Sequence, residues 1–143
     1  MMNTPLEICI LAAGKGTRMK TLVPKMLQPI AGAPMIAHVV STARALKATK
    51  THLVVSEDHA GLKAAIEDQG DLNWVVQAKQ LGTGHAVQQA APSINIDAAV
   101  LVLLGDVPLL SPETLQPLFE DPADVAVLTV NVLSLIHISE PTR

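Results

Sequence analysis

Near its amino terminus the chain reads LAAGKGTRMKTLVPK, and this stretch holds the residues best suited to bind an anion. Gly14 and Gly16 let the backbone turn sharply and leave its N–H groups uncovered. Lys15, Arg18 and Lys25 add three cations within eleven residues. Because exposed backbone donors and fixed cations both attract phosphate groups, the spacing predicts a site for a nucleoside triphosphate or a phosphorylated sugar.

A single carboxylate, that of Asp106, follows the continuously apolar run AAVLVLL and one glycine. Mg²⁺ prefers oxygen ligands and often takes one or two carboxylates beside the phosphates of a substrate. A carboxylate at the end of a buried strand therefore suits a Mg²⁺ site, and a turn or helix-capping aspartate is the plain alternative.

Apolar runs alternate with helix-like segments along the chain, as in repeated βα units. The sequence predicts strands over 6–12, 51–56, 73–77, 98–104 and 124–132, and helices over 34–46, 59–68, 84–91 and 112–120. This order indicates an α/β fold with a Rossmann-like, mostly parallel sheet and helices on both faces. The uninterrupted apolar run at 98–104 predicts a strand that is covered on both faces. Ligands of such sheets bind at the carboxyl ends of the strands, which here are the loops after Ala12, Gln77 and Leu104.

The amino-acid composition of the chain argues against several classes of protein. The chain has 143 residues, about one domain, with 49% apolar residues, one Phe, one Trp, no Tyr and a formal net charge of −3. Few aromatic residues and no basic excess argue against nucleic-acid binding. The longest apolar run has seven residues, whereas a membrane span needs about 20. We expect a soluble, cytoplasmic protein without a membrane partner, in which the lone Cys9 is a small buried hydrophobe.

Two common phosphate-binding motifs do not match the glycine pair. A Walker loop needs G-x-x-x-x-G-K-[ST], but Cys9 stands at its first glycine and Gly16 follows Lys15. A dinucleotide fingerprint needs G-x-G-x-x-G directly before a helix, but Met19 stands at its third glycine. About twenty residues separate Gly14 from the next predicted helix, which is too long for a Rossmann turn.

A third signature fits. The pattern L-x-A-G-x-G-T-R-M followed by P-K resembles that of the sugar-1-phosphate nucleotidylyltransferases; its matching residues are Leu11, Ala13, Gly14, Gly16, Thr17, Arg18, Met19, Pro24 and Lys25. The segment QAKQLGTGHA at 77–86 resembles the nucleobase loop of the bacterial bifunctional N-acetylglucosamine-1-phosphate uridylyltransferase/glucosamine-1-phosphate acetyltransferases, and LGDVPL at 104–109 resembles their metal-binding loop. The similarity runs from about residue 6 to about residue 132, which corresponds to the first part of the family's nucleotidyltransferase domain.

The resemblance implies a reaction and roles for the matching residues. A phosphate oxygen of N-acetylglucosamine 1-phosphate attacks the α-phosphorus of UTP, and UDP-N-acetylglucosamine and pyrophosphate form. Arg18 and Lys25 would act catalytically on the triphosphate, Gln77 would read uracil, and Asp106 would hold Mg²⁺. The residues expected to bind the nucleotide are Leu11, Ala12, Ala13, Gly14, Lys25, Gln77, Gly82, Thr83, Leu104, Gly105 and Asp106. Leu104 departs from the family, whose members often carry Tyr there, so only a backbone contact is expected from it.

The resemblance ends near residue 132, and LSLIHISEPTR at 133–143 looks like a translated sequencing adapter. We therefore expect a truncated nucleotidyltransferase domain over 1–132 and a non-native tail over 133–143, and we expect that the chain alone keeps most of the nucleotide site but does not turn over. A homotrimer is expected only of the full-length family member. Two other functions remain open. Glu57-Asp58, after the second predicted strand, would suit ribose binding in an NAD(P)-dependent oxidoreductase, and a non-catalytic nucleotide-binding module would also use the glycine-rich loop.

Overall fold

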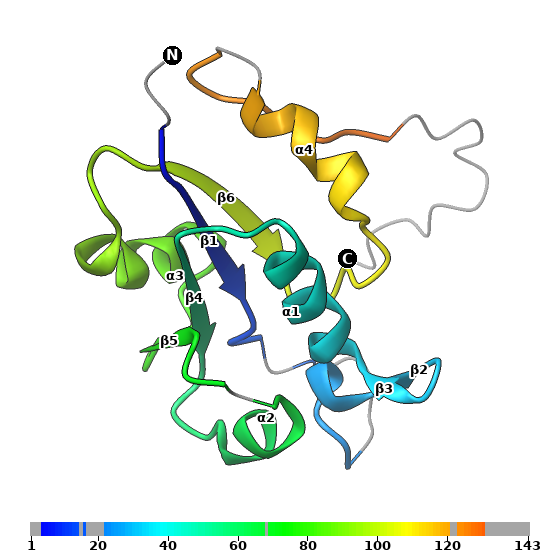
Figure 1. Ribbon diagram of the computed structural model, residues 1–143. Helices are drawn as coiled ribbons and strands as arrows, with labels where there is room; N and C mark the ends of the chain where they lie inside the picture. The colour runs from blue at the N-terminus through cyan, green and yellow to red at the C-terminus, as the bar shows by residue number, and fades with distance from the viewer. Residues whose placement is uncertain (1–3, 15, 17–21, 68, 121–122, 131–143) are drawn as a thin grey trace, which may run out of the picture.

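A parallel sheet forms the centre of the protein, in a computed structural model that describes residues 4–14, 16, 22–67, 69–120 and 123–130. In these residues the sheet has four strands in the order β5-β4-β1-β6, all parallel (Figure 1). The strands are β1 (Leu6–Leu11), β4 (Lys50–Val55), β5 (Leu72–Val76) and β6 (Ala99–Leu104). Each of them confirms a strand predicted from the sequence, with ends that differ by one residue.

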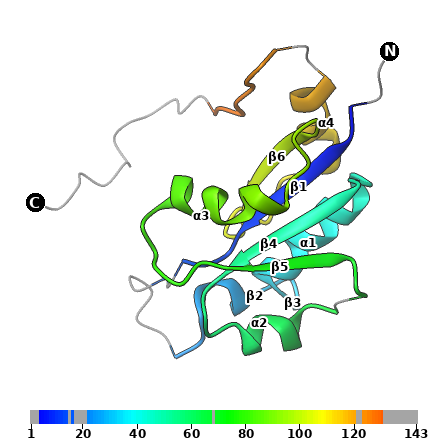
Figure 2. The same cartoon turned by 90° about the vertical axis from the view of Figure 1, so that its left-hand side faces the viewer.

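Helices cover both faces of the sheet, as the sequence predicted. They are α1 (Met35–Ala45), α2 (Ala60–Ala65), α3 (Thr83–Ala90), which continues into the 3₁₀ turn η3 (Ala91–Ser93), and α4 (Pro112–Glu120). Figure 2 shows α3 on one side of the sheet and α1 on the other. The hydroxyl of Ser111 accepts the backbone N–H of Thr114 at 3.3 Å, so Ser111 caps α4 as expected. No helix of the described residues is long and apolar enough to cross a membrane.

Two apolar clusters flank the sheet because alternate side chains of a strand point to opposite faces. Ile8 and Ile10 of β1 pack with the residues of α1 on one face. Cys9 and Leu11 pack toward α3 on the other face. Cys9 is fully buried, and burial raises the pKa of its thiol to about 11, so it is a packing residue.

The outer strand β6 corrects one expectation, because only one of its faces is covered. Val100, Val102 and Leu104 are 41%, 42% and 43% exposed. The register pairs Val102 with Cys9, which places these three side chains on the face that carries α3. That helix packs over β1 and β4, so the apolar row on β6 extends beyond it.

A fifth strand was expected over 124–132, and this prediction is wrong for residues 124–130, which are irregular. Val125, Val127 and Val130 of this segment are 79%, 73% and 82% exposed. The valines have a high strand propensity, but a strand forms only where its backbone pairs with a neighbour and its side chains pack. Residues 131–143, including the expected tail, lie outside the described part of the chain.

The connection from β1 to α1 is long and has its own structure. It contains the 3₁₀ turn η2 (Lys25–Leu27) and a small hairpin of β2 (Pro29–Ile30) and β3 (Ala33–Pro34). Ala31 and Gly32 have φ values of 48° and 83°, as a two-residue hairpin turn of type I′ requires. His38 of α1 contacts the carbonyl oxygen of Ile30 through Nε2 at 2.7 Å and ties the hairpin to the helix. Strand and helix are thus not joined directly, which excludes a Rossmann dinucleotide turn.

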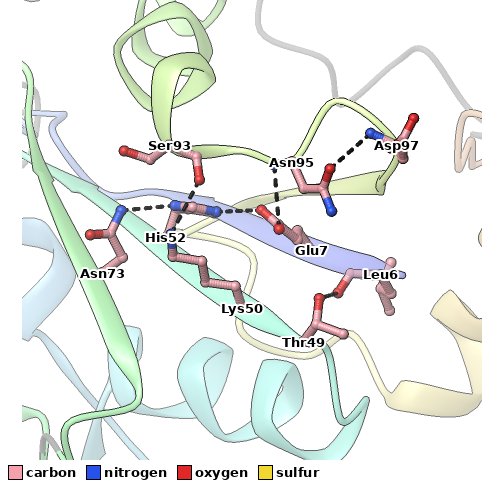
Figure 3. Close-up of polar contacts among 9 residues, drawn as sticks. All are labelled: Leu6, Glu7, Thr49, Lys50, His52, Asn73, Ser93, Asn95 and Asp97. Carbon is pink, nitrogen blue, oxygen red and sulfur yellow. Dashed lines mark hydrogen bonds and ion pairs between the residues drawn. The ribbon is translucent and has the colours of Figure 1, made fainter. Parts of the chain in front are cut away.

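A buried polar cluster joins three strands to the loop after η3 (Figure 3). His52 is fully buried, and its Nε2 lies 2.8 Å from Oε2 of Glu7, which is 5% exposed. The amide nitrogen of Asn73 contacts Nδ1 of His52 at 2.9 Å, and the backbone N–H of Asn95 reaches Oε1 of Glu7 at 3.4 Å. These contacts link β1, β4 and β5 beneath the carboxyl-terminal end of α3, away from the carboxyl ends of the strands.

A bidentate ion pair at the end of α1 gives a pH-dependent prediction. Nε of Arg44 lies 2.7 Å from Oδ2 of Asp71, and Nη2 lies 2.9 Å from Oδ1. The hydrogen bond from Arg44 lowers the pKa of Asp71, so the pair stabilises the fold when the carboxyl is ionised and the effect disappears as pH falls through the lowered pKa. Arg44→Gln should cost about 0.5–1 kcal/mol at pH 7, because the pair is partly exposed. Urea denaturation at pH 7 and pH 3 measures this.

The control for this prediction is Lys47→Gln, which removes the same charge one turn away and should change stability by less than about 0.5 kcal/mol. A loss for Arg44→Gln that is the same at pH 3 as at pH 7 would show that the ion pair does not carry the effect.

Candidate functional site

A pocket of about 270 Å³ opens at the carboxyl ends of β1 and β6. β1 and β6 are neighbours in the sheet, but along the chain β1 is the first of its four described strands and β6 is the last, so the strand order reverses between them. The ligand of an open parallel sheet binds at such a reversal. The residues that line it are Leu11, Ala13, Gly14, Met26, Gln77, Gln80, Gly82, Thr83, Ala86, Leu104 and Asp106. The three loops that the sequence singled out therefore meet at one place.

A second hollow, of about 450 Å³, lies at the opposite end of the sheet, between the end of α1 and the starts of β4 and β5. It is larger, but two charged residues of its wall, Arg44 and Asp71, are already paired with each other. Because the ligands of parallel sheets bind at the carboxyl ends of the strands, the smaller pocket is the candidate site.

The glycine-rich loop begins directly after β1. Gly16 has a φ of +58°, the left-handed region that favours glycine, and a Cβ atom at this position would lie 2.5 Å from Cβ of Lys25. Glycine thus lets the loop approach the lysine closely. Gly14 lies in the pocket wall with open space around it. Lys15 and Arg18, two of the three cations of the expected phosphate site, lie outside the described residues.

Lys25 and Asp106 form an ion pair at the pocket, although 81 residues separate them in the sequence. Nζ of Lys25 lies 2.5 Å from Oδ2 of Asp106, and each side chain is 32% exposed. Lys25 is the first residue of η2, and Asp106 follows β6 and Gly105. The predicted phosphate ligand and the predicted metal ligand thus neutralise each other here. Because both are partly exposed, they can separate toward a polyphosphate and a cation at small cost.

Gly105 directly follows β6 and lies close to the end of β1. Its backbone N–H donates to the carbonyl oxygen of Leu11 at 2.9 Å. A Cβ atom at Gly105 would lie 2.9 Å from that oxygen and 3.1 Å from Sδ of Met26. Gly105→Ala should therefore push the Asp106 loop away from β1 and cost about 1–3 kcal/mol of unfolding free energy, measured by urea denaturation.

Gly14→Ala is the matched control for that prediction, because nothing lies within 4 Å of a Cβ atom at Gly14. Its stability should change by less than about 1 kcal/mol. Equal losses for the two variants would mean that the close approach at Gly105 does not matter.

The loop after β5 contributes Gln77 and the start of α3. Gln77 is 3% exposed, lines the pocket, and places its amide nitrogen 2.8 Å from Nδ1 of His85 and 3.3 Å from the carbonyl oxygen of Gly82. Gly82 has a φ of +106°, which only glycine adopts readily, and precedes Thr83, the first residue of α3. All three are therefore brought to the pocket from one loop.

Most of the expected nucleotide-binding residues line the pocket, but Lys25, Gly105 and Ala12 do not. Lys25 contacts the wall residue Asp106 through the ion pair, and Gly105 lies between Leu104 and Asp106 in the sequence. Ala12 belongs to the core instead. Its side chain is buried in the core cluster beneath α1, and its backbone N–H donates to Val54 at 2.8 Å. The sequence also missed Met26, Gln80 and Ala86, which line the pocket. Ala86 lies one turn after Gly82 on the same side of α3, a helical spacing that could have indicated it.

The residues present suit a divalent cation that is shared with a phosphate substrate. Of the described residues that line the pocket, Asp106 is the one carboxylate. Within the described part of the chain, no three His, Cys, Asp or Glu side chains gather closely enough to hold a metal ion. A site built from the protein alone is therefore not formed by these residues. One carboxylate beside a polyphosphate matches the way Mg²⁺ is commonly held in nucleotide enzymes.

Comparison with known families agrees with this geometry. The model of the MobA-like NTP transferase domain matches residues 8–134, which include the glycine-rich loop, the Gln77 loop and Asp106. The chain belongs to this family. Its nucleotidyltransferase fold confirms the α/β class predicted from the sequence, and the match gives no support to an oxidoreductase.

Individual relatives point the same way. The chain is 52% identical over 131 residues to a protein named "Bifunctional protein GlmU" of Xanthomonas euvesicatoria pv. vesicatoria, and 53% identical over 133 residues to the one of Xylella fastidiosa strain M23. Each match covers 92% of this chain and 29% of the relative, so the chain spans less than a third of the length of these curated relatives. Among solved structures, a nucleotidyl transferase from Methanothermobacter thermautotroptrophicus superposes with a TM-score of 0.70 over 81% of this chain and 57% of that one, at 23% identity.

Proposed function

We propose that the chain is the nucleotide-binding part of a sugar-1-phosphate nucleotidyltransferase that transfers UMP from UTP to N-acetylglucosamine 1-phosphate. The observation that carries the proposal is that Gln77 and Asp106 line one pocket at the carboxyl ends of the sheet, with Lys25 paired to Asp106 at its wall. The relatives, which are named as bifunctional GlmU proteins, support the choice of substrates.

In the proposed nucleotidyl transfer, some residues neutralise charge on the phosphates and others position the base. Lys25 turns from Asp106 to the triphosphate, where it neutralises the charge that builds up on the leaving pyrophosphate. Arg18 adds a planar pair of donors to the same groups. Asp106 holds a Mg²⁺ ion, which when bound polarises the phosphoryl oxygens. The apolar wall of Leu11, Ala13 and Ala86 faces the base, and Gln77 contacts the pyrimidine edge.

The proposal extends to the setting of the protein. We propose that the product, UDP-N-acetylglucosamine, is made in the cytoplasm and supplies precursors of peptidoglycan and lipopolysaccharide. A homotrimer is proposed only for the full-length relative. Neither a nucleic acid nor a membrane is a proposed partner, in keeping with the net charge of −3.

A displacement assay tests the proposed nucleotide. The chain is titrated with a fluorescent uridine nucleotide in the presence of Mg²⁺, and the probe is then displaced with UTP, ATP or NAD. We expect displacement by UTP at concentrations at least about tenfold lower than by ATP or NAD, because the amide of Gln77 in the pocket wall can match the hydrogen-bonding edge of uracil, which adenine does not present. Equal displacement by ATP, or tighter binding of NAD without Mg²⁺, would refute the proposal.

A further inference from the structure

His85 has a polar contact that the proposed reaction does not yet use. It is the third residue of α3, two residues after Thr83 of the pocket wall, and is half-buried. Its Nδ1 lies 2.8 Å from the amide nitrogen of Gln77, and its Nε2 lies 3.3 Å from the amide of the exposed Gln89. The imidazole thus stands between the base-reading glutamine and solvent.

The contacts of Gln77 decide which way its amide faces. The carbonyl oxygen of Gly82, 3.3 Å away, can only accept a hydrogen bond, so the atom that faces it is the NH₂ group. The second hydrogen of that group points to Nδ1 of His85, which must then be the acceptor, with the ring proton on Nε2. Gln89 is exposed and can turn its amide oxygen toward that proton.

The amide oxygen is what Gln77 has left for a ligand. Both of its N–H donors are engaged by Gly82 and His85. Among the described residues, no buried side-chain nitrogen or oxygen lacks a hydrogen-bond partner. Since Oε1 of Gln77 accepts no hydrogen bond from the described residues, it is accessible, and Gln77 is one of the residues that line the pocket. Gln77 therefore presents a hydrogen-bond acceptor, and not a donor, to a base in the pocket.

We propose that His85 is a positioning residue that locks the amide of Gln77 with its oxygen toward the base and thereby selects uracil over cytosine. The inference rests on the proposed function, in which Gln77 contacts the base. Uracil carries a hydrogen on N3 that Oε1 of Gln77 can accept, whereas cytosine has a lone pair on N3 that Oε1 repels. Without the acceptor on His85, the amide is held only by the 3.3 Å contact to Gly82 and can turn over to present its NH₂ group to cytosine.

A matched pair of variants tests the proposal. Leu and Asn have nearly the same shape, but only Asn places an acceptor where Nδ1 of His85 stands. Calorimetry with Mg²⁺ measures the dissociation constants of UTP and CTP for the chain. His85→Leu should lower the preference for UTP over CTP about tenfold, and His85→Asn should keep it within about threefold. Gln89→Ala, on the far side of the ring, should leave the preference unchanged.

The outcomes separate this inference from the proposed function. If the wild-type chain prefers UTP but His85→Leu keeps the same preference, His85 does not set the amide and the inference is wrong, while the proposed function stands. If the wild-type chain shows no preference for UTP, both are wrong. A uniform loss of affinity for both nucleotides in His85→Leu would indicate a structural role only and would also overturn the inference.

A measurement on the unaltered protein covers the case in which His85→Leu does not fold. The ¹⁵N shifts of the imidazole of His85 report which nitrogen carries the proton. We expect the proton on Nε2 and a bare Nδ1, as the contact with Gln77 requires. A proton on Nδ1 would reverse the amide and contradict the proposal.

Discussion

Asp106→Asn is expected to change UTP binding in opposite directions with and without Mg²⁺. With Mg²⁺ present, affinity should fall at least about tenfold, because a carboxylate that binds the cation is replaced by a neutral amide. Without Mg²⁺, affinity should rise several-fold, because the carboxylate no longer repels the triphosphate or occupies Lys25 at 2.5 Å. Calorimetric titrations with UTP in Mg²⁺ and in EDTA measure both effects.

Lys25→Met is the partner change and should lower the affinity for UTP about 10- to 100-fold in either condition, the size of one lost charge-assisted hydrogen bond to a phosphate. Lys47→Met removes a charge at the opposite end of the sheet and serves as the control.

If Asp106→Asn weakened binding equally with and without Mg²⁺, Asp106 would not be the cation ligand.

The second large effect concerns stability and the buried cluster around His52. His52→Leu removes the imidazole from the carboxylate of Glu7, which is 5% exposed and would retain only the 3.4 Å contact with the backbone of Asn95. A buried charge without its partner costs about 3–5 kcal/mol, a large share of the stability of an ordinary domain. Urea denaturation should show this loss.

The double variant Glu7→Leu/His52→Leu should recover most of that loss, because two apolar side chains of similar volume leave no charge without a partner. His59→Leu, which removes a partly exposed histidine, is the control and should cost no more than about 1 kcal/mol. Additive losses in the double variant would mean that Glu7 and His52 do not stabilise the fold as a pair.

The strands and the place of the site could be predicted because both depend on local patterns. Apolar runs predicted β1 and β6, and a short stretch rich in β-branched residues predicted β4, each to within one residue. The loops after β1, β5 and β6 then had to meet, since parallel strands bring their carboxyl ends to one edge. This is why Gly14, Gln77 and Asp106 line a common pocket although they are far apart in the sequence.

What the sequence could not show depends on tertiary contacts. The pairing of Lys25 with Asp106 joins positions 81 residues apart, and no local pattern contains it. Nothing in the local sequence sets His85 apart from other polar residues near a helix start, and its proposed role rests on the 2.8 Å contact with Gln77. The apolar run of β6 predicts a strand but not which of its faces a neighbour covers.

The segment 124–130 is a further case in which tertiary contacts, and not the local sequence, decide the structure. Its valines have the propensity of a strand, but propensity alone does not provide the neighbouring backbone that a strand needs. Ala12 stands at the variable position of the nucleotide-binding signature and was expected to bind the nucleotide with its neighbours, yet the alternation of side chains along the chain places it in the core beneath α1.

One measurement tests the central claim most directly, namely that a uridine nucleotide binds where β1, β5 and β6 end. Backbone amide NMR spectra of the chain are recorded with increasing UTP in the presence of Mg²⁺. We expect the largest shifts at Gly14, Gly82, Thr83 and Gly105, with Gly70 and Asp71 at the other end of the sheet unchanged. Shifts confined to Gly70 and Asp71, or saturating UTP without a shift at Gly14 and Gly82, would contradict the account.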